Sequence, residues 1–479
     1  MATTREMFSE IASWSIEALD EDIARYFYHF SDVSLIERGQ KNYIIGRKGT
    51  GKTAIAEYIK DKESANGNAR LLSFKNFPFN QIYELKDTSY TPPNQYISIW
   101  EYVIYCTMCS MMATDSSVDP LRRRELSSLF SLDIERALSQ SINKISDRGF
   151  NISILGVGAG FTSASQKGVP LDFEQRNEIL RDYIKRHAST KMYYVIFDAL
   201  DEDYKGVLQP DRREVYFELL ISLFKAVQNV RRHVGDLKNV IPLVFLRDDI
   251  FDLCRDPDKN KWLDKAIVLK WSADNLKALI AYRLSKALAV DAPVKSFSDI
   301  WPSVFSETVR ANRKHQKLED SFSYLLRYTY RRPRDVVSYV RECAKLALDR
   351  DLSFVGSPII KEASIGHSDY LRREVIDETY SIIDDISEIL DMLAEQRKSI
   401  FSQSEFIQMY NERFSEEGGL NYKLKADEVL KLLYHFNVVG NIVSGSNHQV
   451  YAYSSNNKKL NPRENVCVHV GLLKALDII

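Results

Sequence analysis

The sequence of 479 residues lacks several features that would place it in a specialised class of protein. Its five scattered cysteines do not form a disulfide framework and indicate a reducing compartment. No apolar run reaches the roughly 18 residues that a membrane-spanning helix needs. Residues 1–20 also lack the apolar segment of a signal peptide. We therefore expect a cytoplasmic protein with no membrane partner.

Neither sign of charge prevails, since 65 basic and 66 acidic residues leave a net charge of −1. That balance gives the chain no overall attraction to nucleic acid. The apolar content of 44% and the charged content of 27% are those of a globular protein. The length allows roughly three domains. Function must therefore be carried by local motifs rather than by composition.

The most specific motif is the pattern G-x-x-x-x-G-K-[ST], which occupies residues 46–53. A short apolar segment, 42–45, precedes it and a helical pattern, 54–60, follows it, which is the order that a phosphate-binding loop requires. Glycines let successive amides turn toward a β-phosphate, and the helix N-terminus adds partial positive charge. We expect Lys52 to reach the β- and γ-phosphates and the Thr53 hydroxyl to bind Mg²⁺. The nucleotide-binding candidates are Gly46, Arg47, Lys48, Gly49, Thr50, Gly51, Lys52 and Thr53.

A second motif follows the apolar segment 191–197, which has the composition of a buried strand. After it the chain continues as Asp198-Ala199-Leu200-Asp201-Glu202. This is the Walker B form, with acids at the carboxyl end of a strand beside the first, at the edge where open parallel sheets bind ligands. We predict that Asp198 holds Mg²⁺ through water. Glu202, or Asp201, would polarise the attacking water. Either aspartate could be the metal partner.

A third strand is expected at 240–246, and it ends at Arg247. A cation at the tip of this strand would point at the γ-phosphate and report its presence, which is the role of a sensor. The alternative is an ion pair between this arginine and Asp248 or Asp249. Arg247 is therefore a candidate for the reaction as well as for a structural contact.

Further strands at 71–74 and 266–269 complete a predicted five-stranded core. The acidic strand lies well over 100 residues beyond the phosphate loop, which is too far for a single crossover. Helical periodicity in that interval predicts a mostly helical insertion at about 80–190, with helices at 96–113, 121–130 and 132–145.

Downstream of this core, Ser272 has the chemistry of a helix N-cap, and the helical patterns after it predict a lid. Glycine and proline at 356–358 and glycine at 366–368 predict a linker between the lid and a last domain. The lid is rich in arginine and lysine, which we interpret as a solvated face rather than a nucleic-acid patch.

The last domain is predicted to have three helices followed by a β-hairpin that turns near Gly445, which indicates a winged helix. Such a domain can bind DNA or protein. Between Asp384 and Glu428 the acids outnumber the bases, and a DNA reader would be expected to expose more basic residues. We therefore favour a protein partner, while DNA stays an alternative.

Together these residues resemble the additional-strand P-loop ATPases, specifically the STAND and origin-recognition-type AAA+ branches. The cluster 198–202 is similar to the D-G/A-x-D-E signature of STAND ATPases, and Arg247 matches their sensor arginine. The segment 331–337, which opens R-R-P-R-D, is similar to a second sensor, so that Arg334 would reach the nucleotide from the lid. From about Tyr43 onward the chain is also similar to a group of bacterial P-loop ATPases with a compact C-terminal domain.

The resemblance implies an α/β fold with a P-loop NTPase parallel sheet and a helical insertion, followed by an α-helical lid and a small winged-helix-like α+β domain. ATP is the expected nucleotide, because residues 260–264 are one residue too long for the guanine-reading motif N-K-x-D and no ABC-transporter signature occurs. The expected domains are an N-terminal helical segment 1–40, a P-loop core 41–272, a lid 273–365 and a winged-helix-like domain 366–479.

The function expected from the resemblance is an ATP-hydrolysing switch that uses ATP and Mg²⁺. Proteins of this kind act as sensors or regulators in bacterial defence with separate partner proteins. This chain would contact a partner, or a second copy of itself, through the lid, the insertion or the winged helix. Two alternatives stay open: a DNA-dependent AAA+ ATPase, such as a loader or transposition regulator, and a scaffold that binds ATP without hydrolysing it.

Overall fold

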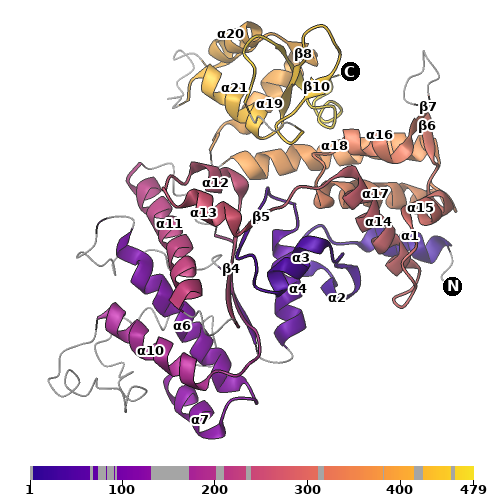
Figure 1. The fold of residues 1–479 in the computed structure, drawn as a ribbon. Helices are drawn as coiled ribbons and strands as arrows, with labels where there is room; N and C mark the ends of the chain where they lie inside the picture. Colours follow the sequence, from indigo (N-terminus) through magenta and orange to yellow (C-terminus); the bar gives the residue numbers. More distant parts are fainter. Residues whose placement is uncertain are drawn as a thin grey trace. The chain divides into compact units, whose positions relative to one another are not determined.

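The computed structural model describes residues 4–64, 68–73, 82, 91, 94–130, 172–200, 210–233, 239–310, 318–380, 382–414, 424–454 and 459–478. The chain divides into two compact units (Figure 1). The core unit is His29–Lys270, and the terminal unit combines Met1–Tyr28 with Trp271–Ile479. The chain therefore passes between the units twice. Within the described ranges no helix is long and apolar enough to cross a membrane.

Five parallel strands form the sheet of the core unit in the order β2-β3-β4-β1-β5. Their bounds are β1 Tyr43–Ile45, β2 Ala69–Ser73, β3 Tyr193–Asp198, β4 Val240–Leu246 and β5 Ala266–Val268. Strands β1, β3 and β4 are buried along their whole length, as expected for a parallel sheet that is covered on both faces. The predicted α/β class with a five-stranded parallel sheet is confirmed.

The sequence predicted that the strand ending at Asp198 lies beside β1, and this prediction is wrong. β4 lies between β1 and β3, with Ile45 opposite Leu246 on one side and Phe197 opposite Val244 on the other. The burial of every residue in β1, β3 and β4 explains why all three lie inside the sheet, with both edges paired, but it does not decide their order. The carboxyl ends of the three strands still share one edge.

Helices flank the sheet of the core unit, and among the described residues α6, α7 and α10 come between β2 and β3 in the chain. The helices are α3 Ser31–Glu37, α4 Lys52–Ser64, α6 Ile97–Thr114, α7 Pro120–Leu129, α10 Phe173–His187, α11 Pro210–His233, α12 Asp248–Leu253 and α13 Lys259–Asp264. The inserted helices match the predicted segments 96–113 and 121–130. The helix predicted at 132–145 lies outside the described residues.

The first part of the terminal unit is helical, with one small two-stranded sheet. Its elements are α1 Thr4–Ser13, η1 Ala18–Asp20, α2 Ile23–Tyr26, α14 Ala273–Leu288, α15 Phe297–Val304, β6 Thr308–Arg310, β7 Leu318–Asp320, α16 Ser321–Arg327, α17 Pro333–Asp349 and α18 Ser357–Thr379. The prediction that Ser272 caps a helix is confirmed, because its hydroxyl accepts the N–H of Asn275 at 3.1 Å at the start of α14.

The segment 1–40, which was predicted to be helical, contains α1, η1, α2 and α3, and the boundary between the two units falls within it, after Tyr28. Phe8 and Trp14 are buried in the same hydrophobic core as side chains of α14 and α17. Arg283 of α14 lies over the ring of Trp14 at 4.6 Å and pairs with Glu21 at 2.8 Å. This pair joins residues 262 positions apart, so no local pattern could have predicted it.

The predicted linker near residues 356–368 is wrong, because α18 runs through it as one helix. Gly356 is the N-cap of α18 and Pro358 lies in its first turn, so these residues start a helix rather than a linker. Gly366 lies inside the helix, where an added Cβ would approach Glu342 Oε2 of α17 to 3.1 Å. Glycine therefore allows α17 and α18 to pack closely.

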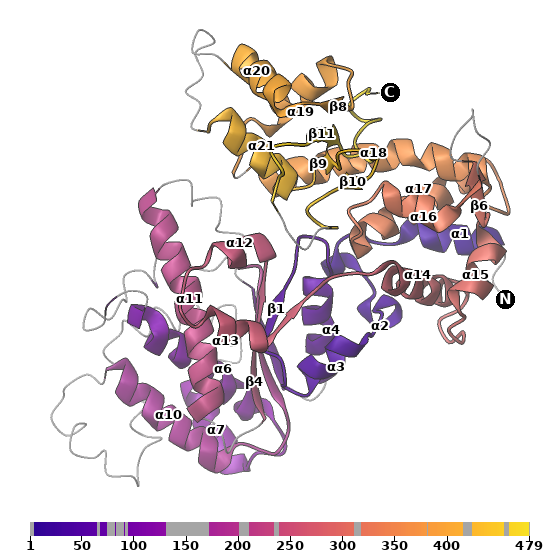
Figure 2. The ribbon, with the colours of Figure 1, turned by 45° about the horizontal axis from the view of Figure 1, so that its top comes forward.

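The remainder of the terminal unit is an α+β arrangement (Figure 2). Its elements are α19 Ile386–Glu395, β8 Ile400–Phe401, α20 Gln403–Arg413, α21 Ala426–His435, β9 Val439–Ile442, β10 Gln449–Val450 and β11 Asn465–Val468. The strands form an antiparallel sheet in the order β10-β9-β11-β8, and Gly445 turns the chain between β9 and β10 with a φ of +78°. The predicted hairpin is confirmed.

Helix α18 contributes to two separate hydrophobic cores. Ile359, Ile360 and Ala363 pack in the core formed by the helices α1, α14 and α17. Leu371 and Val375, further along the same helix, pack in the core of the α+β part. A change in the position of α18 therefore acts on both cores.

Replacing Phe8 by Ala should lower the free energy of unfolding by about 3–5 kcal/mol, because a fully buried ring is lost and a cavity is left. Leu19→Ala is the matched control, since Leu19 lies in the same segment and is 64% exposed; it should change stability by less than about 0.5 kcal/mol. Urea unfolding of the full chain measures both. Equal effects of the two variants would contradict the burial of the N-terminal segment.

Candidate nucleotide site

The predicted phosphate loop lies between the end of β1 and the start of α4. Gly46 donates its N–H to the carbonyl of Leu246 at 3.1 Å, and Ile55 donates its N–H to the carbonyl of Gly51 at 3.0 Å. Gly51 has a φ of +96°, which other residues rarely adopt. At Gly46 an added Cβ would lie only 2.6 Å from Thr50 Oγ1. Position 51 therefore requires glycine because of its backbone conformation, and position 46 requires glycine because there is no space for a Cβ.

Lys52, the first residue of α4, folds back over the loop. Its Nζ donates to the carbonyl oxygens of Gly46 at 2.9 Å and Arg47 at 3.1 Å. The Thr50 hydroxyl donates to the same Arg47 carbonyl at 2.7 Å, and these contacts fix the curvature of the loop. An ammonium group in this position can exchange carbonyl oxygens for phosphate oxygens, which bind it more strongly because they are charged. Thr53 follows in the first turn of α4.

Asp198 ends β3 and is 6% exposed. Ala199 after it has a φ of +58°, a left-handed conformation that is uncommon for alanine and ends the strand abruptly. The carbonyl of Leu200 then accepts the hydroxyl of Tyr216 from α11 at 2.9 Å, which ties the turn to the helix. Asp201 and Glu202, the two candidates for orienting water, lie outside the described residues.

Arg247 follows β4 directly and is buried. Its guanidinium forms a two-bond ion pair with Asp249, with Nε–Oδ1 at 3.0 Å and a second nitrogen to Oδ2 at 2.6 Å. The structure therefore contains the ion pair that the sequence left open as the alternative to a sensor. Because Leu246 lies opposite Ile45, the arginine stands beside the first residue of the phosphate loop.

The sheet brings three of the predicted elements to one edge: the loop 46–53, Asp198 and Arg247. They stand at the carboxyl ends of β1, β3 and β4, where open parallel sheets bind ligands. The hydroxyl of Thr53 and the carboxylate of Asp198 are oxygen ligands of the kind that Mg²⁺ takes together with phosphate oxygens. The predicted lid residue Arg334 belongs to the terminal unit, where it pairs with Glu374 at 3.2 Å and Glu17 at 2.8 Å.

A buried ionic network at the start of α17 was missed by the sequence analysis. Arg332 is 2% exposed and pairs with Asp335 and with Glu378 of α18, both at 3.0 Å. Asp335 also accepts the N–H of Tyr330 at 3.0 Å. The spacing of three between Arg332 and Asp335 was a usable signal, whereas nothing local pointed to Glu378. The network fixes the first turn of α17, which carries Arg334.

The sequence is similar to a known protein family and to a known protein. Residues 274–376 match the family described as a FunZ-associated C-terminal helical domain. A transposon gamma-delta 80.3 kDa protein of Escherichia coli (strain K12) is 21% identical over 336 residues. That match covers 64% of this chain and 43% of the E. coli protein, so the chain spans less than half of that relative's length.

Among solved structures the chain is similar to proteins named Cdc6p, ORC2 and ORC, at low scores. They include Cdc6p from Pyrobaculum aerophilum, with 9% identity, 98% and 96% of the two chains covered and a TM-score of 0.33. The ORC2 protein of Aeropyrum pernix gives 13% identity, coverage of 93% and 89% and a TM-score of 0.35. Drosophila ORC bound to DNA gives 11% identity, coverage of 99% and 92% and a TM-score of 0.30. Scores of this size carry no argument about function.

The class of the protein follows instead from its own architecture. The core unit has five parallel strands, with β4 between β1 and the strand that ends in an acid. The motif G-x-x-x-x-G-K-[ST] forms the turn from β1 to α4. The chain therefore has the fold of an α/β P-loop NTPase, with a largely helical terminal unit.

The left-handed conformation at Ala199 can be tested by substitution. Ala199→Gly should raise the free energy of unfolding by up to about 1 kcal/mol, because glycine has no Cβ to strain in this conformation. Ala226→Gly, at a buried position of α11, is the control and should lower it by about 1 kcal/mol. Urea unfolding measures both, and a loss of stability in Ala199→Gly equal to that in the control would contradict the strained turn.

Proposed function

We propose that the chain is an ATP-dependent switch of the AAA+ type, which binds ATP with Mg²⁺ and hydrolyses it. The observation that carries this proposal is the position of Lys52, whose ammonium lies over a glycine loop at the edge of the sheet where Asp198 and Arg247 also end. A lysine, a carboxylate and an arginine at this edge provide the charges that phosphoryl transfer needs.

Each residue has a defined role in the proposed reaction. The amides of residues 46–53 and the ammonium of Lys52 hold the phosphates, while Thr53 and Asp198 hold Mg²⁺. The metal ion would neutralise charge on the β- and γ-phosphates. Glu202, or Asp201, would orient the attacking water.

The two arginines are proposed as sensors of the phosphate. Arg247 would exchange its ion pair with Asp249 for an interaction with the γ-phosphate. The partner of this arginine would then depend on whether the γ-phosphate is present, and would change on hydrolysis. Arg334 would bind the nucleotide from the lid in the same way. The output would pass through α18, because this helix contributes to the core of the lid and to the core of the α+β part.

A protein partner is proposed for the surfaces outside the nucleotide site, through the lid, the insertion or the winged-helix-like domain, and a second copy of the chain is equally compatible. A role in bacterial defence rests on the resemblance alone. In the candidate recognition helix α21, Lys431 is paired with Asp427 at 2.8 Å and the first turn carries two acids. Local charge of this kind does not favour a DNA phosphate backbone.

The second candidate function is a DNA-dependent ATPase of the loader or transposition type. It is favoured by the similarity to a transposon protein and by the order of elements in the α+β part, a helix, a strand, two helices and a hairpin, which is that of a winged helix. Stimulation of ATP hydrolysis by duplex DNA, weakening steeply with salt, would support it. A scaffold that binds ATP without releasing phosphate is the third candidate.

Lys52→Ala should abolish or severely weaken binding of ATP–Mg²⁺, because the cation over the loop is lost. At 100 times its dissociation constant, ATP should stabilise the unchanged protein by about 2.7 kcal/mol, which a thermal-shift titration detects. Lys60→Ala is the control, because Lys60 lies in the same helix beyond the loop. Equal stabilisation of both variants by ATP would refute the assignment of the site.

Glu202→Gln should retain ATP binding and lose phosphate release, because a neutral amide cannot polarise the attacking water. Asp201→Asn provides the comparison, since the sequence leaves both acids open. Phosphate release from ATP, with and without duplex DNA, measures turnover in each variant. Normal hydrolysis in Glu202→Gln together with its loss in Asp201→Asn would transfer the role to Asp201.

A further inference from the structure

A cavity of about 710 Å³ lies within the core unit, which is in the size range of sites for small molecules. Its wall is formed by the segment 39–43, the last turns of α11, helix α13 and Lys265. Asn42 in this wall precedes Gly46 of the phosphate loop by four residues, or about 13 Å of extended strand. The cavity and the candidate nucleotide site therefore lie at opposite ends of β1, so that a ligand in one leaves the other free.

Basic side chains prevail in the wall of this cavity, which we call the basic cavity. Among the described residues that line it are four bases and one acid, Asp264. The four bases are Arg231, Arg232, Lys261 and Lys265. Lys261 pairs with Asp258, and the other three form no ion pair among the residues that the structure describes. The wall therefore has an excess of positive charge.

Arg231, near the end of α11, is held in place by carbonyl groups rather than by an acid. Its two terminal nitrogens donate to the carbonyls of Val240 and Gly39, both at 2.9 Å. These carbonyls belong to β4 and to the segment before β1, so the guanidinium does not cap its own helix. Burial lowers the pKa of Arg231, because the charge is partly removed from water. An anion beside this guanidinium would offset that cost.

The position of Arg231 favours a small anion over the backbone of a nucleic acid. This arginine is half-buried, so that an anion must enter the hollow to reach it, whereas Arg232 and Lys265 are exposed. A guanidinium has five N–H donors, and the two carbonyls leave others for the oxygens of an anion. The planar fork of these donors matches phosphate oxygens.

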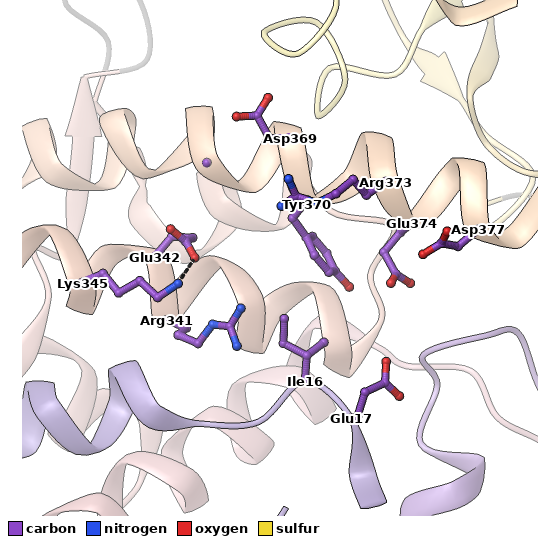
Figure 3. A pocket seen from close by; sticks show the side chains of 11 residues that line it. Ile16, Glu17, Arg341, Glu342, Lys345, Asp369, Tyr370, Arg373, Glu374 and Asp377 are labelled. Atoms are coloured by element: carbon purple, nitrogen blue, oxygen red, sulfur yellow. Dashed lines mark hydrogen bonds and ion pairs between the residues drawn. The ribbon is translucent and has the colours of Figure 1, made fainter. Parts of the chain in front are cut away.

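The cavity of the terminal unit, of about 520 Å³, differs from the basic cavity in its charge. Both acids and bases line it, and Lys345 pairs with Glu342 at 2.8 Å inside it (Figure 3). Glu17 and Glu374, which also line it, pair with Arg334. Because acids in this wall already neutralise bases, the basic cavity is the better candidate for an anion.

We propose that the basic cavity binds a small molecule that carries a phosphate group. Arg231 holds the phosphate oxygens through its remaining N–H groups, and the unpaired cations Arg232 and Lys265 add to the attraction. The site is separate from the phosphate loop, so the proposal does not depend on the binding or hydrolysis of ATP.

The first test measures the affinity of full-length variants for inorganic pyrophosphate by calorimetric titration at low salt. All of them carry Lys52→Ala, so that the phosphate loop has lost its cation. Arg232→Gln and Lys265→Gln should each weaken binding about two- to fivefold, because each removes one unpaired positive charge. Arg231→Gln should weaken it about tenfold or more, because charge-assisted hydrogen bonds to the phosphate are lost.

Arg124→Gln is the matched control, because it removes one positive charge elsewhere in the core unit. Arg124 is exposed on α7 and forms no ion pair among the described residues, so its substitution should leave the affinity unchanged. Equal weakening by Arg124→Gln, Arg232→Gln and Lys265→Gln would reveal general electrostatics and overturn the proposal. So would failure of pyrophosphate to bind. The side chains of Arg232 and Lys265 are exposed, so these variants decide the test even if Arg231→Gln unfolds.

Hydrogen–deuterium exchange locates the bound pyrophosphate in the Lys52→Ala protein. Exchange of the amides of residues 39–43 and 259–265 should slow on binding. Slowing confined to residues 46–53 would place the anion in the phosphate loop and refute the basic cavity.

Duplex DNA tests whether the same cations form a nucleic-acid surface instead. The proposal predicts that DNA does not displace pyrophosphate. Displacement by DNA whose own binding is weakened by Arg232→Gln and Lys265→Gln would overturn the assignment to a small molecule. The ATP-binding function is tested separately by thermal shift of the protein with Lys52 intact, so failure of one proposal is distinguishable from failure of the other.

Discussion

The pairing of β1 with β4 decides where the groups of the candidate nucleotide site lie. The ladder continues one residue past β1, because the N–H of Gly46 bonds to the carbonyl of Leu246. This bond holds the first turn of the phosphate loop against the end of β4 and brings Arg247 beside it. Asp198 ends the next strand along the same edge. The backbone hydrogen bonds of the sheet thus bring a cation, a loop of amides and a carboxylate to one edge, and the side chains of Thr50, Lys52 and Asp249 fix the loop and the cation there.

The terminal unit is organised around α17 and α18, which are joined by ion pairs of unequal strength. The buried network of Arg332, Asp335 and Glu378 is costly to break, because a buried charge without its partner is strongly destabilising. The pairs of Arg334 with Glu17 and Glu374 lie nearer to solvent. The unit therefore combines a fully buried ionic connection between the two helices with a partly exposed one.

Local features of the fold were predictable from the sequence. The strand, loop and helix at the phosphate site have a motif that glycine conformation and lysine charge explain, and Ser272 was identified as a cap because N-cap chemistry is local. The hairpin between β9 and β10 was predictable because Gly445 is a residue that favours a turn. For the candidate site, the sequence predicted the edge at which Asp198 and Arg247 lie, since both end apolar strands.

Long-range features were not predictable. The position of β4 between β1 and β3 depends on which strands pair along its two edges, and no residue of β4 indicates these neighbours. Gly366 suggested a linker, but its small size serves the contact between α17 and α18 instead. The burial of Trp14 under Arg283 joins segments that are far apart in the chain. The errors therefore concerned the partners of segments, except at 356–368, where a helix was taken for a linker.

Hydrogen–deuterium exchange of the amides of residues 46–53, with and without ATP–Mg²⁺, tests the central claim most directly. Phosphate oxygens that accept hydrogen bonds from these amides should slow their exchange, and the Lys52→Ala variant should lose this protection. Slowed exchange confined to the loop and the start of α4 is the predicted result. Unchanged exchange of the loop at saturating ATP would contradict a nucleotide site at this edge of the sheet.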